Sequence, residues 1–127
     1  MKSKYDIIII GAGAGGLGVA IGMAKFGFSV LLAEKDRNNF GGECLNSGCI
    51  PSKALLHVAG QIHGGRQATA YGPSLTGTAD LSKVWAYVHR KQAAIRAHES
   101  AEYLEREEGI DTVIGTAKFT GPQSIAV

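Results

Sequence analysis

A glycine-rich segment near the start of the chain constrains the fold more than any other feature. The segment from Tyr5 to Ile10 ends in four consecutive isoleucines and predicts a strand buried on both faces of a parallel sheet. The next residues read Gly11-Ala-Gly13-Ala-Gly-Gly16, and a helix is predicted over 14–26, with a stop at Gly27. A second strand is predicted over 29–33. The N-terminal part is therefore a strand, helix and strand in succession.

Each glycine of this segment has a physical reason to be there. Gly11 permits a tight turn, Gly13 lets the backbone approach a pyrophosphate, and Gly16 lets the helix pack closely on the strand. Glu34 ends the second strand, where its carboxylate can accept hydrogen bonds from ribose hydroxyls. The free N–H groups and dipole of the helix favour an anion there. We therefore predict a site for an ADP-containing dinucleotide, either FAD or NAD(P). The alternative is a glycine turn that only packs the helix.

Charge and length exclude several classes of protein. The 127 residues suffice for one domain, and 13 Lys and Arg against 11 Asp and Glu give a net charge of only +2. We expect no nucleic-acid partner and no polybasic membrane surface. Residues 7–24 carry no charge, but their glycines argue against a membrane span. We expect a soluble, cytoplasmic protein.

The two cysteines form a second motif. Cys44 and Cys49 are five residues apart, which in an ideal helix means about 7.5 Å along the axis and roughly 140° around it. A disulfide usually needs Cα atoms within about 6.8 Å, so a bridged segment must be distorted, and Gly48 and Pro51 allow this. Lys53 and a helix start at Cys49 would favour a thiolate. We predict a redox pair.

Two other interpretations of the cysteines remain open. The first is a pair of buried, inert thiols. The second is a zinc site made of Cys44, Cys49, His57 and His63, although its spacing is shorter than that of common zinc fingers. We favour redox chemistry and expect no metal site.

The rest of the chain predicts two more helices and a β-rich tail. Pro51 suits the first turn of a helix that runs to about Ala59, and residues 60–78 are predicted as loop. Asp80 can cap a long helix that reaches about Glu108 and closes at Gly109. A strand and a hairpin are predicted over 112–127. The fold class is α/β, a Rossmann-like parallel sheet with flanking helices.

The stretch Gly41-Gly-Glu-Cys44-Leu-Asn-Ser-Gly-Cys49-Ile-Pro51-Ser-Lys53, with the N-terminal glycines, resembles one family over nearly the whole chain. These are the class I pyridine nucleotide-disulfide oxidoreductases, FAD enzymes that include dihydrolipoamide dehydrogenase, glutathione reductase and mercuric reductase. The resemblance implies an FAD/NAD(P)-binding fold whose tail starts a β-meander. Residues 1–127 would be the N-terminal part of the FAD-binding domain, without the later FAD, NAD(P) and interface domains. The chain alone is then expected to be incomplete and inactive.

The resemblance also implies site residues. Gly11, Gly13 and Gly16 would hold the FAD pyrophosphate region, with Glu34 on the adenosine ribose. Cys44 would be the interchange thiol that attacks substrate, and Cys49 the charge-transfer thiol beside the flavin. The other implied cofactor contacts are Gly42 and Glu43 along the pyrophosphate, Lys53 near the flavin, and Gly115 and Ala117 on the adenine side. The family often has Thr where this chain has Glu43.

The resemblance implies electron transfer from NAD(P)H through FAD to the cysteines and on to an acceptor. That acceptor is a small-molecule disulfide or a metal ion, since dihydrolipoamide dehydrogenase-like and mercuric reductase-like stretches are both present. The full-length protein is expected to be a homodimer. The alternative function is a non-catalytic module that binds ADP or flavin, or that associates with itself.

Overall fold

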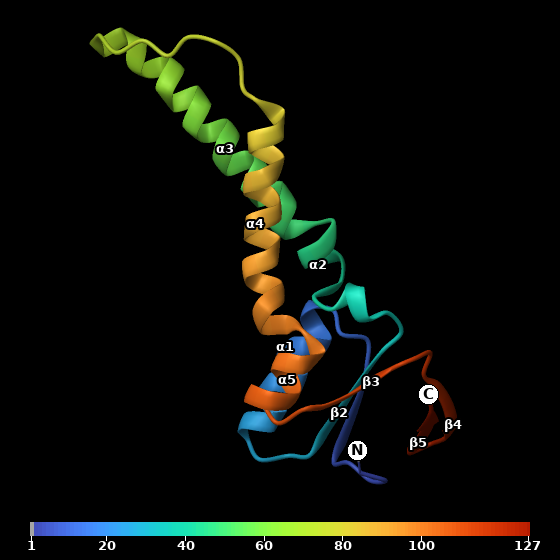
Figure 1. The fold of residues 1–127 in the computed structure, drawn as a ribbon. Coiled ribbons are helices and arrows are strands. Elements are labelled where there is room, and N and C mark those ends of the chain that lie inside the picture. Colours follow the sequence, from blue (N-terminus) through green and yellow to red (C-terminus); the bar gives the residue numbers. More distant parts are fainter. Residues whose placement is uncertain (1) are drawn as a thin grey trace.

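The computed structural model describes residues 2–127 and consists of a small α/β body from which two long helices project (Figure 1). In chain order the elements are β1 (Ile7–Ile10), α1 (Ala14–Lys25), β2 (Val30–Glu34), the 3₁₀ turn η1 (Arg37–Asn39), α2 (Gly42–Asn46), α3 (Cys49–Gln67), the 3₁₀ turn η2 (Ala68–Tyr71), α4 (Leu81–Glu99), α5 (Ala101–Glu107), β3 (Asp111–Ile114), β4 (Lys118–Gly121) and β5 (Ser124–Ala126).

The body is built on a parallel sheet with the strand order β1-β2-β3. Ile7 of β1 pairs with Val30 of β2, and Leu31 of β2 pairs with Asp111 of β3. Every residue of the central strand β2 is buried. Strands β4 and β5 form a separate antiparallel hairpin. This arrangement confirms the predicted Rossmann-like sheet and the hairpin that follows it.

The prediction that β1 is buried on both faces is wrong. Ile7 and Ile9 pack on the core, whereas Ile8 and Ile10 are 37% and 47% exposed. Strand β1 lies at the edge of the sheet, and residues 2–127 leave its second face largely uncovered. Four isoleucines in a row are compatible with burial on one face or on two, so the sequence alone could not distinguish these cases.

The core lies between the sheet and helices α1 and α5. Leu17 and Ala20 of α1 meet Leu32 of β2, and Leu104 of α5 joins the same cluster. A Cβ atom at Gly16 would overlap the carbonyl oxygen of Gly11, so α1 can approach β1 this closely only with glycine at that position. The packing reason predicted for Gly16 is therefore present.

Helix α3 is longer than predicted, because it continues from Cys49 to Gln67 and the next turn η2 reaches Tyr71. The expectation of a loop from residue 60 onward is wrong for this part. Each glycine inside a helix, such as those of α3, lowers the stability of the helix by about 1 kcal/mol relative to alanine. Helix α4 packs alongside α3, and these tertiary contacts offset that cost (Figure 1).

The long helix predicted after Asp80 is divided in two. Asp80 caps α4 as predicted, and its side chain accepts a hydrogen bond of 2.9 Å from the N–H of Ser82. Ser100 is extended, with φ −72° and ψ 154°, and its Oγ accepts a bond of 3.2 Å from the N–H of Tyr103. This second cap lets α5 turn back onto the sheet and bury Leu104. Gly109, at φ 67°, ends the turn after α5.

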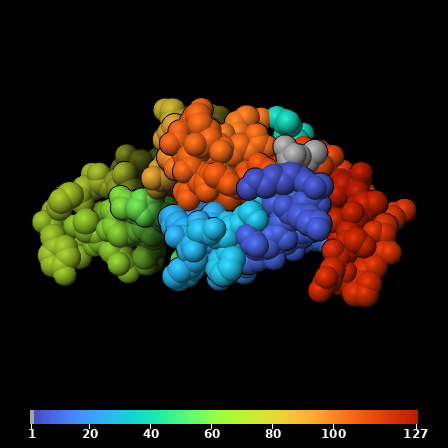
Figure 2. Space-filling view, turned by 90° about the horizontal axis from the view of Figure 1, so that it is seen from below, coloured from blue at the N-terminus to red at the C-terminus, as the bar shows by residue number. Residues whose placement is uncertain are grey.

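The molecule is elongated, with α3 and η2 at one end and the β4–β5 hairpin at the other, as Figure 2 shows in green and red. Among residues 2–127, none of the helices has the combination of length and apolar character needed to cross a membrane.

Candidate functional site

The glycine turn between β1 and α1 leaves open space above its backbone. The N–H of Gly11 donates to the carbonyl of Ala33 at 2.8 Å, which joins the turn to β2. A Cβ atom at Gly11 or at Gly13 would meet no other atom within 4 Å. Helix α1 begins at Ala14, and no side chain of the described residues caps it. Its first N–H groups lack intrahelical partners, so the turn fits a phosphate group.

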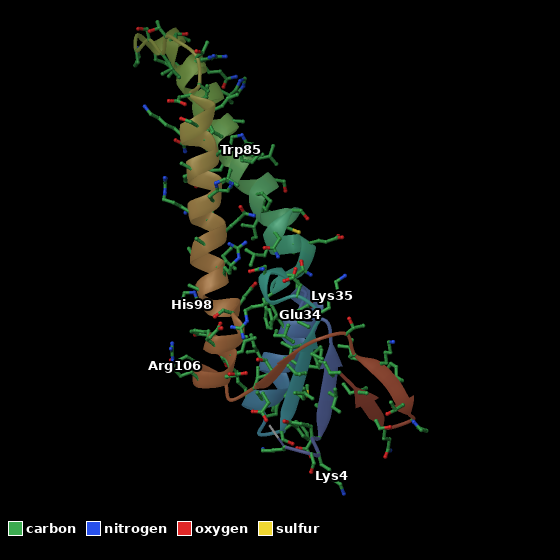
Figure 3. The ribbon with its side chains drawn as sticks, turned by 45° about the vertical axis from the view of Figure 1, so that its right-hand side comes forward. Lys4, Glu34, Lys35, Trp85, His98 and Arg106 are labelled. Carbon is green, nitrogen blue, oxygen red and sulfur yellow. The ribbon has the colours of Figure 1, made fainter. Side chains whose placement is uncertain are left out.

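Glu34 fixes this turn against the end of β2. Its side chain is only 5% exposed. One carboxylate oxygen, Oε2, accepts a hydrogen bond of 2.7 Å from the N–H of Ala12, and Oε1 accepts one of 2.9 Å from the N–H of Lys35. Figure 3 shows Glu34 and Lys35 at the end of β2 that faces the start of α1. Sequence reasoning predicted a ribose contact and missed this structural role.

The ribose contact of Glu34 remains a prediction. A carboxylate oxygen has two acceptor positions, so the bond from Ala12 leaves capacity at Oε2 for a further donor. The signal available in the sequence for this bond to the backbone was an acidic residue at the end of the second strand.

The second glycine pair lies directly on the first turn. The N–H of Gly41 donates to the carbonyl of Ala12 at 2.9 Å. A Cβ atom at Gly42 would lie only 2.8 Å from the Cα of Gly13. Gly41 and Gly42 have φ values of 84° and 59°, which favour glycine. Helix α2, with Glu43 exposed in its first turn, therefore begins beside the N-terminus of α1.

Cys44 and Cys49 lie on opposite sides of a break between two helices. Cys44 belongs to α2, and Cys49 is the first residue of α3. The N–H of Gly48 in the break donates to the carbonyl of Glu43 at 2.6 Å. The local distortion predicted for this segment is present. Both cysteines are free thiols in the structure, Cys44 half-buried and Cys49 exposed.

The two cysteine side chains are close enough for one to influence the protonation of the other. Hydrogen bonding to Cys49 raises the pKa of Cys44, and partial burial and the negative charges of Cys49 and Glu99 raise it further. The Cys44 thiol therefore gives up its proton less readily than an isolated cysteine does. Neighbouring thiols can form a disulfide and can reduce another one by exchange.

Glu99 ends α4 beside this segment. Its Oε2 lies 2.6 Å from the point where a Cβ of Gly41 would stand. Burial raises the pKa of its carboxyl group. Glu99 thus adds a negative charge close to Cys44, a neighbour that the sequence interpretation missed because 55 positions separate them in the sequence.

The remaining predicted site residues are more dispersed. Lys53 is exposed on α3 and lines a groove of about 290 Å³ between α3 and α4. The N–H of Gly115 donates to the carbonyl of Glu34 at 2.9 Å, which brings the start of the tail to the glycine turn. Ala117 is half-buried just before β4. The structure therefore groups the predicted glycines, Glu34, Glu43 and the cysteines at one end of the sheet, and Lys53 beyond them.

The zinc alternative has no geometric support in residues 2–127. No group of three or more His, Cys, Asp and Glu side chains in this range could hold a metal ion. The ring of His57 stacks instead on Tyr87 of α4, with centroids 5.7 Å apart.

Comparison with known proteins agrees with this geometry. Residues 5–126 match the family model described as pyridine nucleotide-disulphide oxidoreductase. The chain is 37% identical over 123 residues to a dihydrolipoyl dehydrogenase of Thermus scotoductus, covering 97% of this chain and 26% of the relative. A dihydrolipoyl dehydrogenase of Bacillus subtilis is 36% identical over 124 residues, covering 96% and 25%. The chain thus spans about a quarter of the length of the curated relatives it matches.

A solved structure shares the fold. The Cu(II) complex of the HOCl-induced flavoprotein disulfide reductase RclA from Escherichia coli superposes with a TM-score of 0.69 at 28% identity, covering 94% of this chain and 24% of RclA. These matches confirm the resemblance inferred from the glycine and cysteine motifs, and with it the expected FAD cofactor. The chain belongs to the pyridine nucleotide-disulphide oxidoreductase family.

Proposed function

We propose that this chain supplies the ADP-binding turn and the redox cysteines of an FAD-dependent disulfide reductase. The observation that carries the proposal is the contact between the two motifs. Gly42 lies against Gly13, so helix α2, which carries Cys44, begins at the open glycine turn. In the full-length protein, electrons would pass from NAD(P)H through FAD to the cysteine pair and on to an acceptor.

Different residues of the chain would bind different parts of the cofactor. The backbone of Gly11 and Gly13 and the N-terminus of α1 would hold the pyrophosphate, with Gly42 and Glu43 along it. Glu34 would contact the ribose through its remaining acceptor positions, with Gly115 and Ala117 on the adenine side. Lys53 would lie near the flavin, which supplies two-electron transfer when FAD is bound.

The two thiols would reduce a disulfide by exchange. The Cys44 thiol loses its proton and attacks one sulfur of the external disulfide, and the other sulfur leaves as a thiolate that takes up a proton. Cys49 then attacks the Cys44 sulfur, so the first half of the substrate leaves as a second thiol and a Cys44–Cys49 disulfide forms. The return to the dithiol needs two electrons and two protons, and bound FAD would supply the two electrons from NAD(P)H.

For the acceptor, we favour a small-molecule disulfide of the dihydrolipoyl type. Several relatives of 34–37% identity are named dihydrolipoyl dehydrogenase, which supports this choice. A metal ion, as in a mercuric reductase, is the other candidate. Steady-state NAD(P)H oxidation by the full-length protein, with lipoamide in one assay and Hg(II) in the other, discriminates between the two.

We also propose a cytoplasmic location and a homodimer for the full-length protein. Two adjacent free thiols suit a reducing compartment, in which dithiol chemistry is sustained.

Equilibrium binding of FAD tests the proposal directly. Flavin fluorescence quenching measures the dissociation constant for the chain and for Gly13→Val, whose side chain would enter the open space above the turn. Gly18→Val is the matched control, because Gly18 also has open space around it but lies further along α1. We expect Gly13→Val to weaken binding at least about tenfold and the control to bind normally. Equal binding by both variants would contradict the proposal.

A second candidate function, self-association, is favoured by one specific feature. Ile8 and Ile10 of β1 and Phe119 of β4 are exposed and border a cavity of about 900 Å³. Exposed apolar surface of this kind is suited to a second copy of the chain. Sedimentation equilibrium of the chain and of Ile10→Thr tests it: a dimer that dissociates in the variant supports self-association, and a monomer throughout excludes it.

A further inference from the structure

We propose that Gln92 and Arg96 of α4 are positioning residues that hold Cys44 at its partner Cys49. The inference rests on the proposed redox function of the cysteine pair. It assigns a role in that function to two side chains outside the glycine and cysteine motifs.

Helix α2 cannot hold its own position. It has only five residues, Gly42–Asn46, and a helix of that length is unstable without tertiary contacts. Its last carbonyl groups also have no partners within the helix. Contacts that fix the C-terminal end of α2 therefore also fix the position of Cys44, which lies just before Leu45 in this short helix.

Gln92 supplies the missing donors at this end. Its side chain is 8% exposed, one of two buried polar or charged side chains among the described residues. Nε2 of Gln92 donates to the carbonyl of Leu45 at 2.9 Å and to the carbonyl of Asn46 at 3.0 Å. A single amide group thus satisfies the carbonyls of the two residues that follow Cys44, and a buried amide is costly unless it is bonded in this way.

Arg96 extends the same contact by one helical turn. Its Nη2 donates to Oδ1 of Asn46 at 2.7 Å. The amide nitrogen of Asn46 donates in turn to the carbonyl of Gly42 at 2.9 Å and to that of Phe40 at 3.2 Å. Arg96 therefore orients Asn46, and Asn46 ties the end of α2 to its beginning.

The network ends at the break between the two cysteines. Cys49 starts α3, which is anchored independently by its packing along α4. With α2 held by Gln92 and Arg96 and α3 held by the rest of α4, a single rigid helix fixes both thiols. Preorganisation of this kind raises the effective concentration of one thiol at the other.

The equilibrium between the thiols and glutathione measures that effective concentration. Cys44–SH and Cys49–SH react with one glutathione disulfide to give the Cys44–Cys49 disulfide and two glutathione thiols, so atoms and electrons balance. Trapping of thiols at defined glutathione ratios, read by mass spectrometry of the full chain, gives the equilibrium constant. Flavin is not needed, so failure to bind FAD would count against the proposed function and leave this measurement intact.

The variants separate positioning from folding. Gln92→Met keeps the length of the side chain and removes its donor, and Arg96→Met removes the donor to Asn46. Their matched controls are Gln61→Met on the exposed surface of α3 and Arg90→Met on the exposed surface of α4. Arg96→Lys retains a cationic donor. Thermal melting, followed by circular dichroism, records stability separately for each variant.

We expect Gln92→Met to lower the equilibrium constant for the disulfide on the order of tenfold, the effect of losing one buried and one partly buried hydrogen bond. Arg96→Met should lower it by a smaller factor, and Arg96→Lys should restore most of it. Both controls should match the parent chain. Folded variants with an unchanged constant, or controls with the same loss, would overturn the proposal. If Gln92→Met does not fold, the exposed Arg96 variants decide by the same criteria.

Discussion

Replacement of Glu34 by glutamine tests whether this carboxylate holds the glycine turn in place. Glu34 is 5% exposed, and its carboxylate accepts a hydrogen bond from the N–H of Ala12, which is fully buried. The carboxylate also accepts from the N–H groups of Lys35 and Asp36, at 2.9 and 3.4 Å. Glutamine has nearly the same shape but only one acceptor oxygen. In either orientation its NH₂ group faces a backbone donor.

The magnitude follows from these contacts. A hydrogen bond to a charged group contributes about 1.5–3 kcal/mol, and a buried N–H left without a partner costs about 1–3 kcal/mol. We therefore expect Glu34→Gln to lower the free energy of unfolding by about 2–3 kcal/mol. For a chain of this size that corresponds to a fall in melting temperature of roughly 10 °C.

Urea unfolding followed by far-UV circular dichroism gives the free energy. Glu107→Gln is the matched control, because Glu107 forms an exposed ion pair with Arg106 at the surface. Exposed pairs contribute about 0–1 kcal/mol. A free energy for Glu34→Gln within about 0.5 kcal/mol of the parent chain would refute the structural role given to Glu34.

Three further predictions follow from the same structure. Gly16→Ala should lower the free energy of unfolding by about 1–3 kcal/mol in urea, because its Cβ would overlap the Gly11 carbonyl, whereas Gly18→Ala should be neutral or stabilising. Cys49→Ala removes the bond that raises the pKa of Cys44, so Cys44 should react faster with iodoacetamide at pH 8; an unchanged rate would contradict the thiol contact. Hydrogen bonds from Ser82 lower the pKa of Asp80 below 3.8, so its capping contribution should persist above that pH and be lost below it. Acid melts of the parent chain and Asp80→Ala should therefore converge as the pH falls; melts that stay equally far apart would count against the cap.

The predictions that held were those set by local backbone requirements. The turn at Gly11, the close packing at Gly16 and the distortion between the cysteines each follow from what a few adjacent residues can adopt. Asp80 was predictable as a cap for the same reason, since its carboxylate bonds to a residue two positions away.

The features that the sequence did not predict depend on distant contacts. Glycines in α3 argued for a loop, but packing against α4 keeps that segment helical to Gln67. The chain bends at Ser100 between α4 and α5, and this bend lets Leu104 pack into the core. In the sequence, Gln92 cannot be distinguished from a polar residue on a helix surface. It is buried in the structure because α2 packs against it.

The absorption spectrum of the FAD-loaded protein under anaerobic reduction tests the central claim most directly. If Cys49 lies beside the flavin, reduction of the cysteine pair should produce a long-wavelength charge-transfer band between its thiolate and oxidised flavin. The band should persist in Cys44→Ser and disappear in Cys49→Ser. Bound FAD that shows no such band in the parent protein, or the same band in both variants, would contradict the assignment of these two cysteines.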